Sequence, residues 1–207
     1  MDNDSLAGIN PSQVRRGSSN FMSSCHGLIL AGGLSTRMGT DKAKLCRNQQ
    51  TMLGYTESLL HSLGLNVLVS GGDKGIPDVV PMSGPLGGIY TVIKGNPVDA
   101  LLIVPVDMPL LTSSLLQQLI SVGESSGTAV CYQDCYLPLY LPVNTELSDY
   151  LAQVFSEGAS LPRSIKKMLT AVNAIQIPVT EPMTLINANT PEEWLSIKPL
   201  IETDDAE

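Results

Sequence analysis

The sequence predicts a three-layer α/β protein, in which helices cover both faces of a mostly parallel, Rossmann-like sheet. Short apolar runs alternate along the chain with amphipathic segments of helical period, which is the pattern of strand–helix–strand units. The run at 99–106 is apolar almost throughout, as expected for a central strand covered on both faces. The chain has 207 residues, enough for one domain of this kind.

The first half of the chain alternates between the two element types. Its predicted elements are strand 28–31, helix 51–63, strand 66–70, a short strand at 79–80, a helix from 84 to about 94, and strand 99–106. The hydroxyl of Thr51 is suited to cap the first helix. Gly64 is suited to end it, because glycine adopts the left-handed conformation that often follows a helix.

The second half continues the alternation. It is predicted to contain a helix capped by Thr112, strands at 128–133 and 136–141, helices at about 146–156 and 164–172, strands at 175–179 and 185–186, and a last helix. The last helix begins at Thr190, where threonine as cap, proline at the first position and glutamate at the third form a start signal.

The chain divides into three parts. Residues 1–24 are polar and rich in serine, asparagine and glycine, which is typical of a mobile extension. Residues 25–201 form the α/β domain, and residues 202–207 form an acidic tail.

Composition and charge exclude several classes of protein. The 12 basic and 20 acidic residues give a net charge of −8, which argues against non-specific binding of nucleic acid. No apolar run approaches the ~20 residues of a membrane-spanning helix. The first 22 residues have no apolar segment of the kind found in signal peptides, so we expect a cytoplasmic protein with four reduced cysteines and no zinc site.

A glycine-rich loop follows the first strand. Strand 28–31 ends at Gly32 and Gly33, and the residues that follow include Arg37 and Lys42. Glycines let backbone N–H groups approach phosphate oxygens, and cationic side chains neutralise them. The spacing fits neither the Walker loop nor the dinucleotide-binding fingerprint. A plain structural turn at the two glycines remains an alternative.

Asp107 stands at the carboxyl end of the apolar strand 99–106, where open α/β sheets bind their ligands. Pro109 ends the strand. A carboxylate that faces a triphosphate needs a cation between them, and Mg²⁺ is commonly held by one or two carboxylates together with phosphate oxygens. Asp107 is therefore a candidate ligand of Mg²⁺. The alternative is that Asp107 caps the next turn.

The loop also resembles a known signature. Residues Leu30 to Ala43 read Leu-Ala-Gly-Gly-Leu-Ser-Thr-Arg-Met-Gly-Thr-Asp-Lys-Ala. This run resembles, without a break, the signature of the MobA family, the molybdenum cofactor guanylyltransferases. Four further segments are similar to that family, and together they extend the resemblance over nearly the whole chain after Cys25: Gly84 to Ile89, Pro105 to Pro109, Asp134 to Leu139 with Cys135 in place of glycine, and Asn187 to Trp194.

The resemblance implies a role for each matched residue. It places Lys42 at the phosphates, Asp107 at Mg²⁺, and Asn187 and Asn189 on the pterin side. Arg37 is our own candidate for stabilising charge at the transferred phosphate, so Arg37, Lys42 and Asp107 are the candidate catalytic residues. The remaining nucleotide-binding candidates are Leu30, Ala31, Gly32, Gly33, Ser70, Met82, Gly84, Pro85 and Leu86.

Two departures concern the base. The family usually has asparagine at the end of the second strand, where this chain has Ser70, and an aspartate directly after the third strand, where we expect Met82. Asp73 and Asp78 are nearby, but neither occupies the expected place. Backbone carbonyls around Gly71, Gly72 and Met82 would then read guanine, with a narrower preference for GTP over ATP and ITP.

The resemblance implies the transfer of GMP from GTP to the phosphate of molybdenum–molybdopterin, with Mg²⁺ as cofactor and pyrophosphate as second product. Proteins that make or accept the molybdenum cofactor would be possible partners. A sister enzyme that uses CTP or a sugar phosphate is an alternative, although cytidylyl relatives tend to have Ala-Ala-Gly where this chain has Ala31-Gly32-Gly33. A non-catalytic cofactor-binding relative is another.

Overall fold

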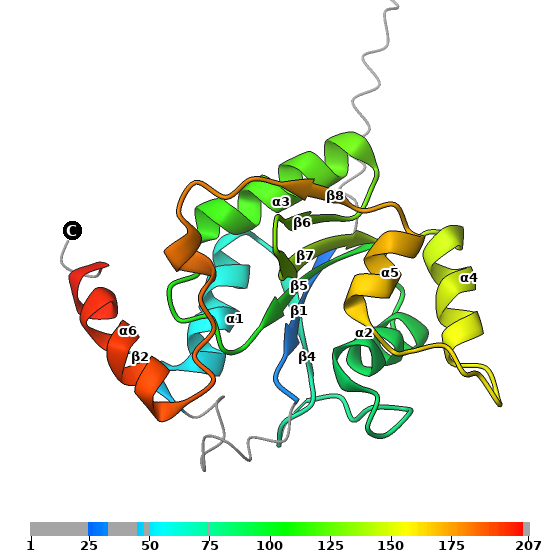
Figure 1. Cartoon of the computed structure of the whole chain (residues 1–207), viewed down its shortest axis with the longest axis horizontal. Helices are drawn as coiled ribbons and strands as arrows, with labels where there is room; N and C mark the ends of the chain where they lie inside the picture. Colours follow the sequence, from blue (N-terminus) through cyan, green and yellow to red (C-terminus); the bar gives the residue numbers. More distant parts are fainter. Residues whose placement is uncertain (1–24, 33–44, 48–49, 74, 205–207) are drawn as a thin grey trace, which may run out of the picture.

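The computed structural model describes residues 25–32, 45–47, 50–73 and 75–204. Its centre is a six-stranded sheet (Figure 1). The first three strands in spatial order are parallel, the fourth is antiparallel to both of its neighbours, and the last two are parallel, so the expected mostly parallel sheet is confirmed. The order is β4 (Asn66–Ser70), β1 (Cys25–Leu30), β5 (Ala100–Pro105), β7 (Cys135–Pro142), β6 (Val130–Tyr132) and β8 (Ile175–Ile177).

Helices cover both faces of the sheet, as the expected three layers require (Figure 1). On one face α1 (Met52–Ser62) and α3 (Ser113–Ser126) close one apolar core. On the other face α2 (Gly84–Gly95), α4 (Thr145–Val154) and α5 (Ile165–Ala171) close a second one. Strand β5 supplies Leu102 and Val104 to the first core and Leu101 and Ile103 to the second, which confirms its central position.

The helix boundaries follow the predicted capping residues. The hydroxyl of Thr51 accepts a hydrogen bond from the N–H of Gly54 at 3.1 Å, and that of Thr112 accepts one from Leu115 at 3.4 Å. Gly64 follows α1 with a φ of +76°, as predicted for a helix end.

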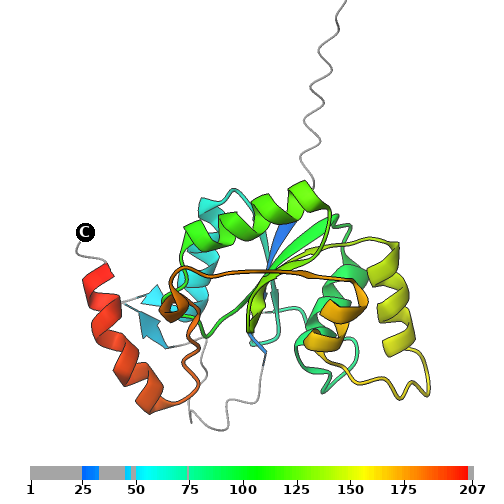
Figure 2. The same ribbon diagram turned by 45° about the horizontal axis from the view of Figure 1, so that its top comes forward.

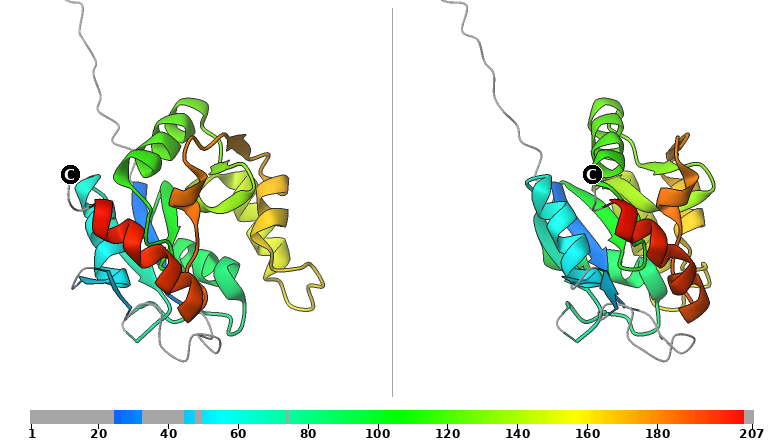
Figure 3. Two further views of the ribbon diagram at one scale, coloured as in Figure 1. Left: turned by 60° about the vertical axis from the view of Figure 1, so that its left-hand side comes forward. Right: turned by 90° about the vertical axis from the view of Figure 1, so that its left-hand side faces the viewer.

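A smaller unit lies beside the sheet. It contains the hairpin of β2 (Cys46–Arg47) and β3 (Gln50–Thr51), the 3-10 helix η2 (Pro182–Leu185), and α6 (Pro191–Asp204). Figures 2 and 3 show α6 near this hairpin, on the α1 side of the molecule. Ile197 and Ile201 of α6 pack on Leu110 and Ala188, which attaches the helix to the segment that follows β5.

Helix α6 begins with the predicted capping box: the hydroxyl of Thr190 accepts from the N–H of Glu193 at 3.2 Å, and Glu193 Oε2 accepts from the N–H of Thr190 at 3.1 Å. The helix continues to Asp204, beyond the expected start of the acidic tail at 202. Residues 1–24 lie outside the described part of the chain, so the division into three parts stays a prediction.

Two predicted strands are wrong. Val79 and Val80 lie in a bend, because Pro77 and Pro81 flank them and the N–H of Val79 donates to the hydroxyl of Thr91 instead of to a strand. The chain joins β4 earlier, through an isolated parallel bridge between Ile76 and Ser70.

The pair 185–186 is not a strand either. Leu185 closes η2, where Thr184 and Ile186 donate to carbonyls three residues back. The other predicted elements are found within a few residues of their expected bounds, and the β2–β3 hairpin was not predicted.

None of the described helices is long and apolar enough to cross a membrane.

Candidate active site

The ends of four strands meet at one edge of the sheet. The parallel strands β4, β1 and β5 end there with Ser70, Leu30 and Pro105. Strand β7 is antiparallel to β5, so its first residue, Cys135, lies at the same edge. Side chains that follow these ends are therefore brought together, in the order β4, β1, β5, β7.

A cavity of about 470 Å³ opens at this edge. Its wall combines residues from β1, α2, the end of β5, the β6–β7 turn, α5 and the segment before α6. Six of the predicted site residues line it: Leu30, Ala31, Gly32, Pro85, Asp107 and Asn187. Asp134, Cys135, Tyr136, Leu137 and Ile165, with Pro105 and Val106, complete the lining.

The ends of β1 and β4 are packed tightly together. The N–H of Ala31 donates to the carbonyl of Ser70 at 2.9 Å. Gly71 has a φ of +77°, and a Cβ atom at this position would collide with the backbone of Gly32. Only glycine satisfies both conditions, so these two loops form one floor beside the cavity.

Asp107 reaches the cavity from the end of β5, as expected. Its backbone carbonyl accepts from the N–H of Ala188 at 2.8 Å, which fixes the segment 187–189 next to it. Its Oδ1 atom is buried and receives no hydrogen bond from the described residues, while Asp107 as a whole takes part in other interactions.

The donor set fits a hard divalent cation. Asp107 and Asp134 place carboxylates on the same cavity, and the described residues contain no group of three or more histidine, cysteine, aspartate or glutamate side chains that would hold a metal by themselves. Mg²⁺ needs only one or two carboxylates when phosphate oxygens supply further ligands. The residues present therefore suit a metal that arrives with a triphosphate.

The two asparagines of the predicted pterin side are placed differently. Asn187 lines the cavity. Asn189 does not, and its backbone N–H donates to Glu193 Oε2 at 2.6 Å at the start of α6. The buried side chain of Ala188 lies between them in sequence and packs against α6.

The predicted residues at the start of α2 also differ in whether they line the cavity. Gly84 begins the helix with a φ of +60°, and Pro85 lines the cavity. The side chain of Leu86 is fully buried in the core between α2 and the sheet, so only the backbone of Leu86 is left to contact a nucleotide, and its predicted role stays a prediction. Gly33, Arg37 and Lys42 lie outside the described residues.

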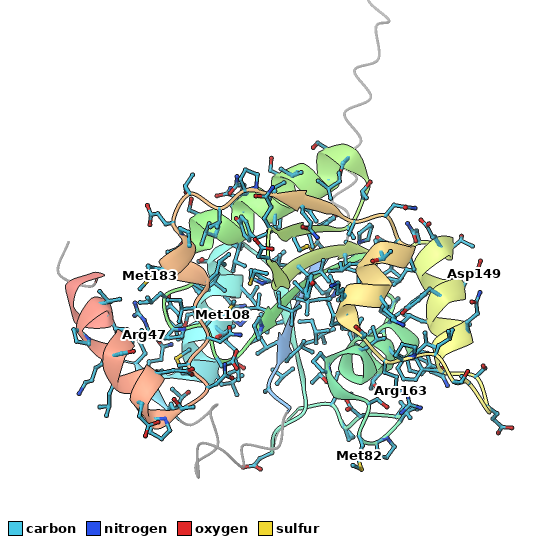
Figure 4. The ribbon with its side chains drawn as sticks, in the orientation of Figure 1. Arg47, Met82, Met108, Asp149, Arg163 and Met183 are labelled. Atoms are coloured by element: carbon cyan, nitrogen blue, oxygen red, sulfur yellow. The ribbon has the colours of Figure 1, made fainter. Side chains whose placement is uncertain are left out.

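The expectation for Met82 depended on the wrong third strand. Met82 is 94% exposed, has a φ of 56°, and does not line the cavity. Figure 4 shows its side chain at the outer end of the loop below α2. Because the chain after β4 pairs with this strand at Ile76, the first acid after this pairing is Asp78.

Asp78 lies against the end of β4. Its Oδ1 accepts from the hydroxyl of the buried Ser70 at 3.4 Å, and its Oδ2 lies 3.4 Å from the position of a Cβ atom on Gly87 of α2. Gly88 faces Ser70 so closely that a side chain there would collide with the serine hydroxyl. Ser70 is thus joined to Asp78, an acid that was not expected at the base.

Cys135 stands in the cavity wall where related sequences were expected to have glycine. Its Sγ donates to the carbonyl of Leu137 at 2.9 Å. Burial raises the pKa of this thiol, and the hydrogen bond to Leu137 lowers it by less. The side chain is therefore a neutral thiol near pH 7 and presents a polarizable, uncharged surface.

The cavity residues 134–137 and 165 were not predicted as site residues. The signal for 134–137 was present, since strands predicted at 128–133 and 136–141 imply a turn at this edge. Ile165 carries no such signal, because its place depends on how α5 packs on the sheet.

Comparison with known proteins identifies the family. The model of the MobA-like NTP transferase domain matches residues 27–172. A molybdenum cofactor guanylyltransferase from Xanthomonas euvesicatoria is 38% identical over 176 residues, which cover 81% of this chain and 91% of that protein.

Solved structures show the same fold. The molybdopterin-guanine dinucleotide biosynthesis protein A from Archaeoglobus fulgidus superposes with a TM-score of 0.67 at 20% identity, over 86% of this chain and 99% of that one. A 2-C-methyl-D-erythritol 4-phosphate cytidylyltransferase from Thermus thermophilus gives 0.60 at 15% identity, over 86% and 98%. Both likenesses concern the fold alone, while the family match and the 38% identical relative establish that this chain belongs to the MobA-like NTP transferases and is a nucleotidyltransferase.

Proposed function

We propose that this enzyme transfers GMP from GTP to the phosphate of molybdopterin and releases pyrophosphate. The observation that carries the proposal is the order of groups along one sheet edge: Asp78 with Ser70 at β4, Gly32 at β1, and Asp107 at β5. Gly32 and Asp107 line the cavity, and the pair of Asp78 and Ser70 lies outside its lining. This order matches a nucleotide that lies with its base toward β4 and its phosphates toward β5. The curated relative that matches over most of both chains carries the corresponding name.

Asp78 is our candidate for reading the base. A carboxylate accepts hydrogen bonds from both guanine N1–H and the 2-amino group, and a charged acceptor makes stronger hydrogen bonds than a backbone carbonyl. Cytosine presents no such pair of donors. Ser70 donates to Asp78 Oδ1, which helps to hold the carboxylate in one orientation and leaves Oδ2 available. We therefore expect a larger preference for GTP over ITP than the narrow preference that was expected with Met82 at the base.

Asp107 is our candidate for holding Mg²⁺, together with oxygens of the triphosphate. When bound, the metal would supply positive charge at the phosphates. Lys42 and Arg37, predicted from sequence, would add to this charge. The remaining task of the chain is to hold the reacting groups in line, which by itself supplies a large part of the rate in such reactions.

The acceptor would occupy the cavity between Asp107 and the β6–β7 turn. One of its phosphate oxygens forms a bond to the α-phosphorus of GTP, and the bond from that phosphorus to the pyrophosphate oxygen breaks. The leaving pyrophosphate takes the electron pair. No general base is needed, because the attacking phosphate is already ionised near neutral pH. Asn187 reaches this cavity and is suited to donate a hydrogen bond to the acceptor.

The experiment is a turnover assay of the full chain with molybdopterin, Mg²⁺ and one nucleotide at a time. We expect pyrophosphate and a guanine dinucleotide with GTP. A preference for CTP would favour the cytidylyl alternative, which the shared fold leaves open. Binding of GTP without release of pyrophosphate would favour a non-catalytic relative. The cytoplasmic location and any partner proteins of molybdenum cofactor biosynthesis stay predictions.

A further inference from the structure

One charged side chain is buried among the described residues, and it lies outside the cavity. Arg47, in β2, is 8% exposed. Burying a guanidinium is unfavourable unless its N–H groups and its charge are compensated. Its Nε donates to the carbonyl of Pro109 at 3.0 Å, and its central carbon lies 4.2 Å from the centroid of the Tyr55 ring. The arginine is thus fixed between the hairpin, α1 and the turn after β5.

Tyr55 contacts the same turn. Its hydroxyl donates to the carbonyl of Leu111 at 2.6 Å. The hydrogen bonds from Arg47 and Tyr55 hold the turn at Pro109 and Leu111, just after Asp107. On the other side of the turn, the Asp107 carbonyl accepts from Ala188. Figure 4 labels Arg47 and Met108, of which Met108 belongs to this turn.

We propose that Arg47, with Tyr55, is a positioning residue for Asp107. The pair fixes the turn on which the carboxylate is carried, so that it stays directed at the metal and phosphates. Neither side chain lines the cavity, so neither is a catalytic residue. The inference rests on the proposed role of Asp107.

The test uses Arg47→Met, which keeps length and removes the hydrogen bond and the charge, and two milder variants, Arg47→Lys and Tyr55→Phe. Tyr55→Phe keeps the ring below Arg47 and removes only the bond to Leu111. Mn²⁺ binding to the chain with GTP, followed by water-proton relaxation, gives a readout that does not require turnover. Pyrophosphate release gives the Mg²⁺ concentration for half-maximal rate and the KM for GTP.

We expect Arg47→Met to weaken Mn²⁺ binding and to raise the half-maximal Mg²⁺ concentration roughly tenfold, since small displacements of a reacting group are costly. The KM for GTP at saturating Mg²⁺ should change little. Tyr55→Phe should shift both metal readouts in the same direction by less. Lys94→Met is the control, because Lys94 is an exposed cation 5.6 Å from the Tyr90 ring, on α2, which covers the opposite face of the sheet from α1.

A lower melting temperature with unchanged metal readouts in all three variants would overturn the proposal and leave Arg47 a purely structural residue. If Arg47→Met does not fold, Mn²⁺ binding and the half-maximal Mg²⁺ concentration of Arg47→Lys and Tyr55→Phe test the proposal instead. Wild type that binds Mn²⁺ with GTP but releases no pyrophosphate would contradict the proposed function, while the metal shift in the variants would still support the positioning role.

Discussion

The carboxylates of Asp107 and Asp78 lie at the same edge of the sheet but are held in different ways. Asp107 lies just after the central strand, and carbonyls of its turn accept hydrogen bonds from the backbone N–H of Ala188 and from the side chains of Arg47 and Tyr55. Asp78 comes from a loop between two prolines, and its side chain accepts one 3.4 Å hydrogen bond, from the hydroxyl of Ser70. We infer that the β5 end is built for chemistry that tolerates no displacement, whereas the β4 end can vary and tune the choice of base.

The largest effect is expected at the β5 end. Asp107→Asn should lower kcat by about 10³-fold, the scale of losing one preorganised charge-stabilising group. The measurement is pyrophosphate release with molybdopterin, GTP and Mg²⁺. Asp149→Asn is the matched control, since Asp149 is an exposed carboxylate on α4 that does not line the cavity. Full activity of the Asp107 variant, or wild-type turnover in excess EDTA, would contradict the role of Asp107.

The phosphate loop between the two ends should show the next largest effect. Lys42→Ala should weaken GTP binding roughly 100-fold, as expected for the loss of charged hydrogen bonds, and should leave guanosine binding nearly unchanged. Calorimetry with both ligands separates these cases. An equal loss for guanosine and GTP would show that Lys42 does not act on the phosphates.

Cys135 tests the acceptor side, beyond the β5 end. Its raised pKa predicts that alkylation by N-ethylmaleimide is slower than at the exposed Cys46 and accelerates as the pH rises toward that pKa. The adduct should raise the KM for molybdopterin roughly 30-fold, or ~2 kcal/mol, a mid-range cost of overpacking.

GTP binding should be retained after alkylation, because the proposed orientation directs the base toward β4, away from Cys135. Cys135→Ser provides the unreactive control of similar size. Loss of GTP binding on alkylation, with binding of the acceptor retained, would reverse the assignment of the two sides.

The two ends of the site also differ in how well their residues could be predicted from sequence. The places of the β1 loop and of Asp107 were predictable. Each directly follows a recognisable apolar strand, and residues that follow a parallel strand lie at the carboxyl edge of the sheet whatever the rest of the tertiary fold. Asp78 was missed because Val79 and Val80 have the composition of a strand, and only the bridge between Ile76 and Ser70 shows that pairing ends before them.

Arg47 was missed for a different reason. An arginine next to a loop is expected at the surface, and its burial depends on Tyr55 and on a carbonyl 62 positions away. Contacts of this range are set by packing, which periodicity and turn signals do not report. Leu86 shows the converse: a residue within a matched motif that serves the core.

The assignment of the base rests on Asp78, and one measurement tests it most directly: the ratio of kcat/KM for GTP and ITP in wild type and in Asp78→Asn. ITP lacks the 2-amino group, so wild type should favour GTP, and the variant should lose roughly tenfold of that preference, or ~1.4 kcal/mol. Met82→Ala, the control on the same loop, should leave the ratio within about twofold. An unchanged ratio in Asp78→Asn, or a wild-type preference for CTP, would contradict a guanine site at the end of β4.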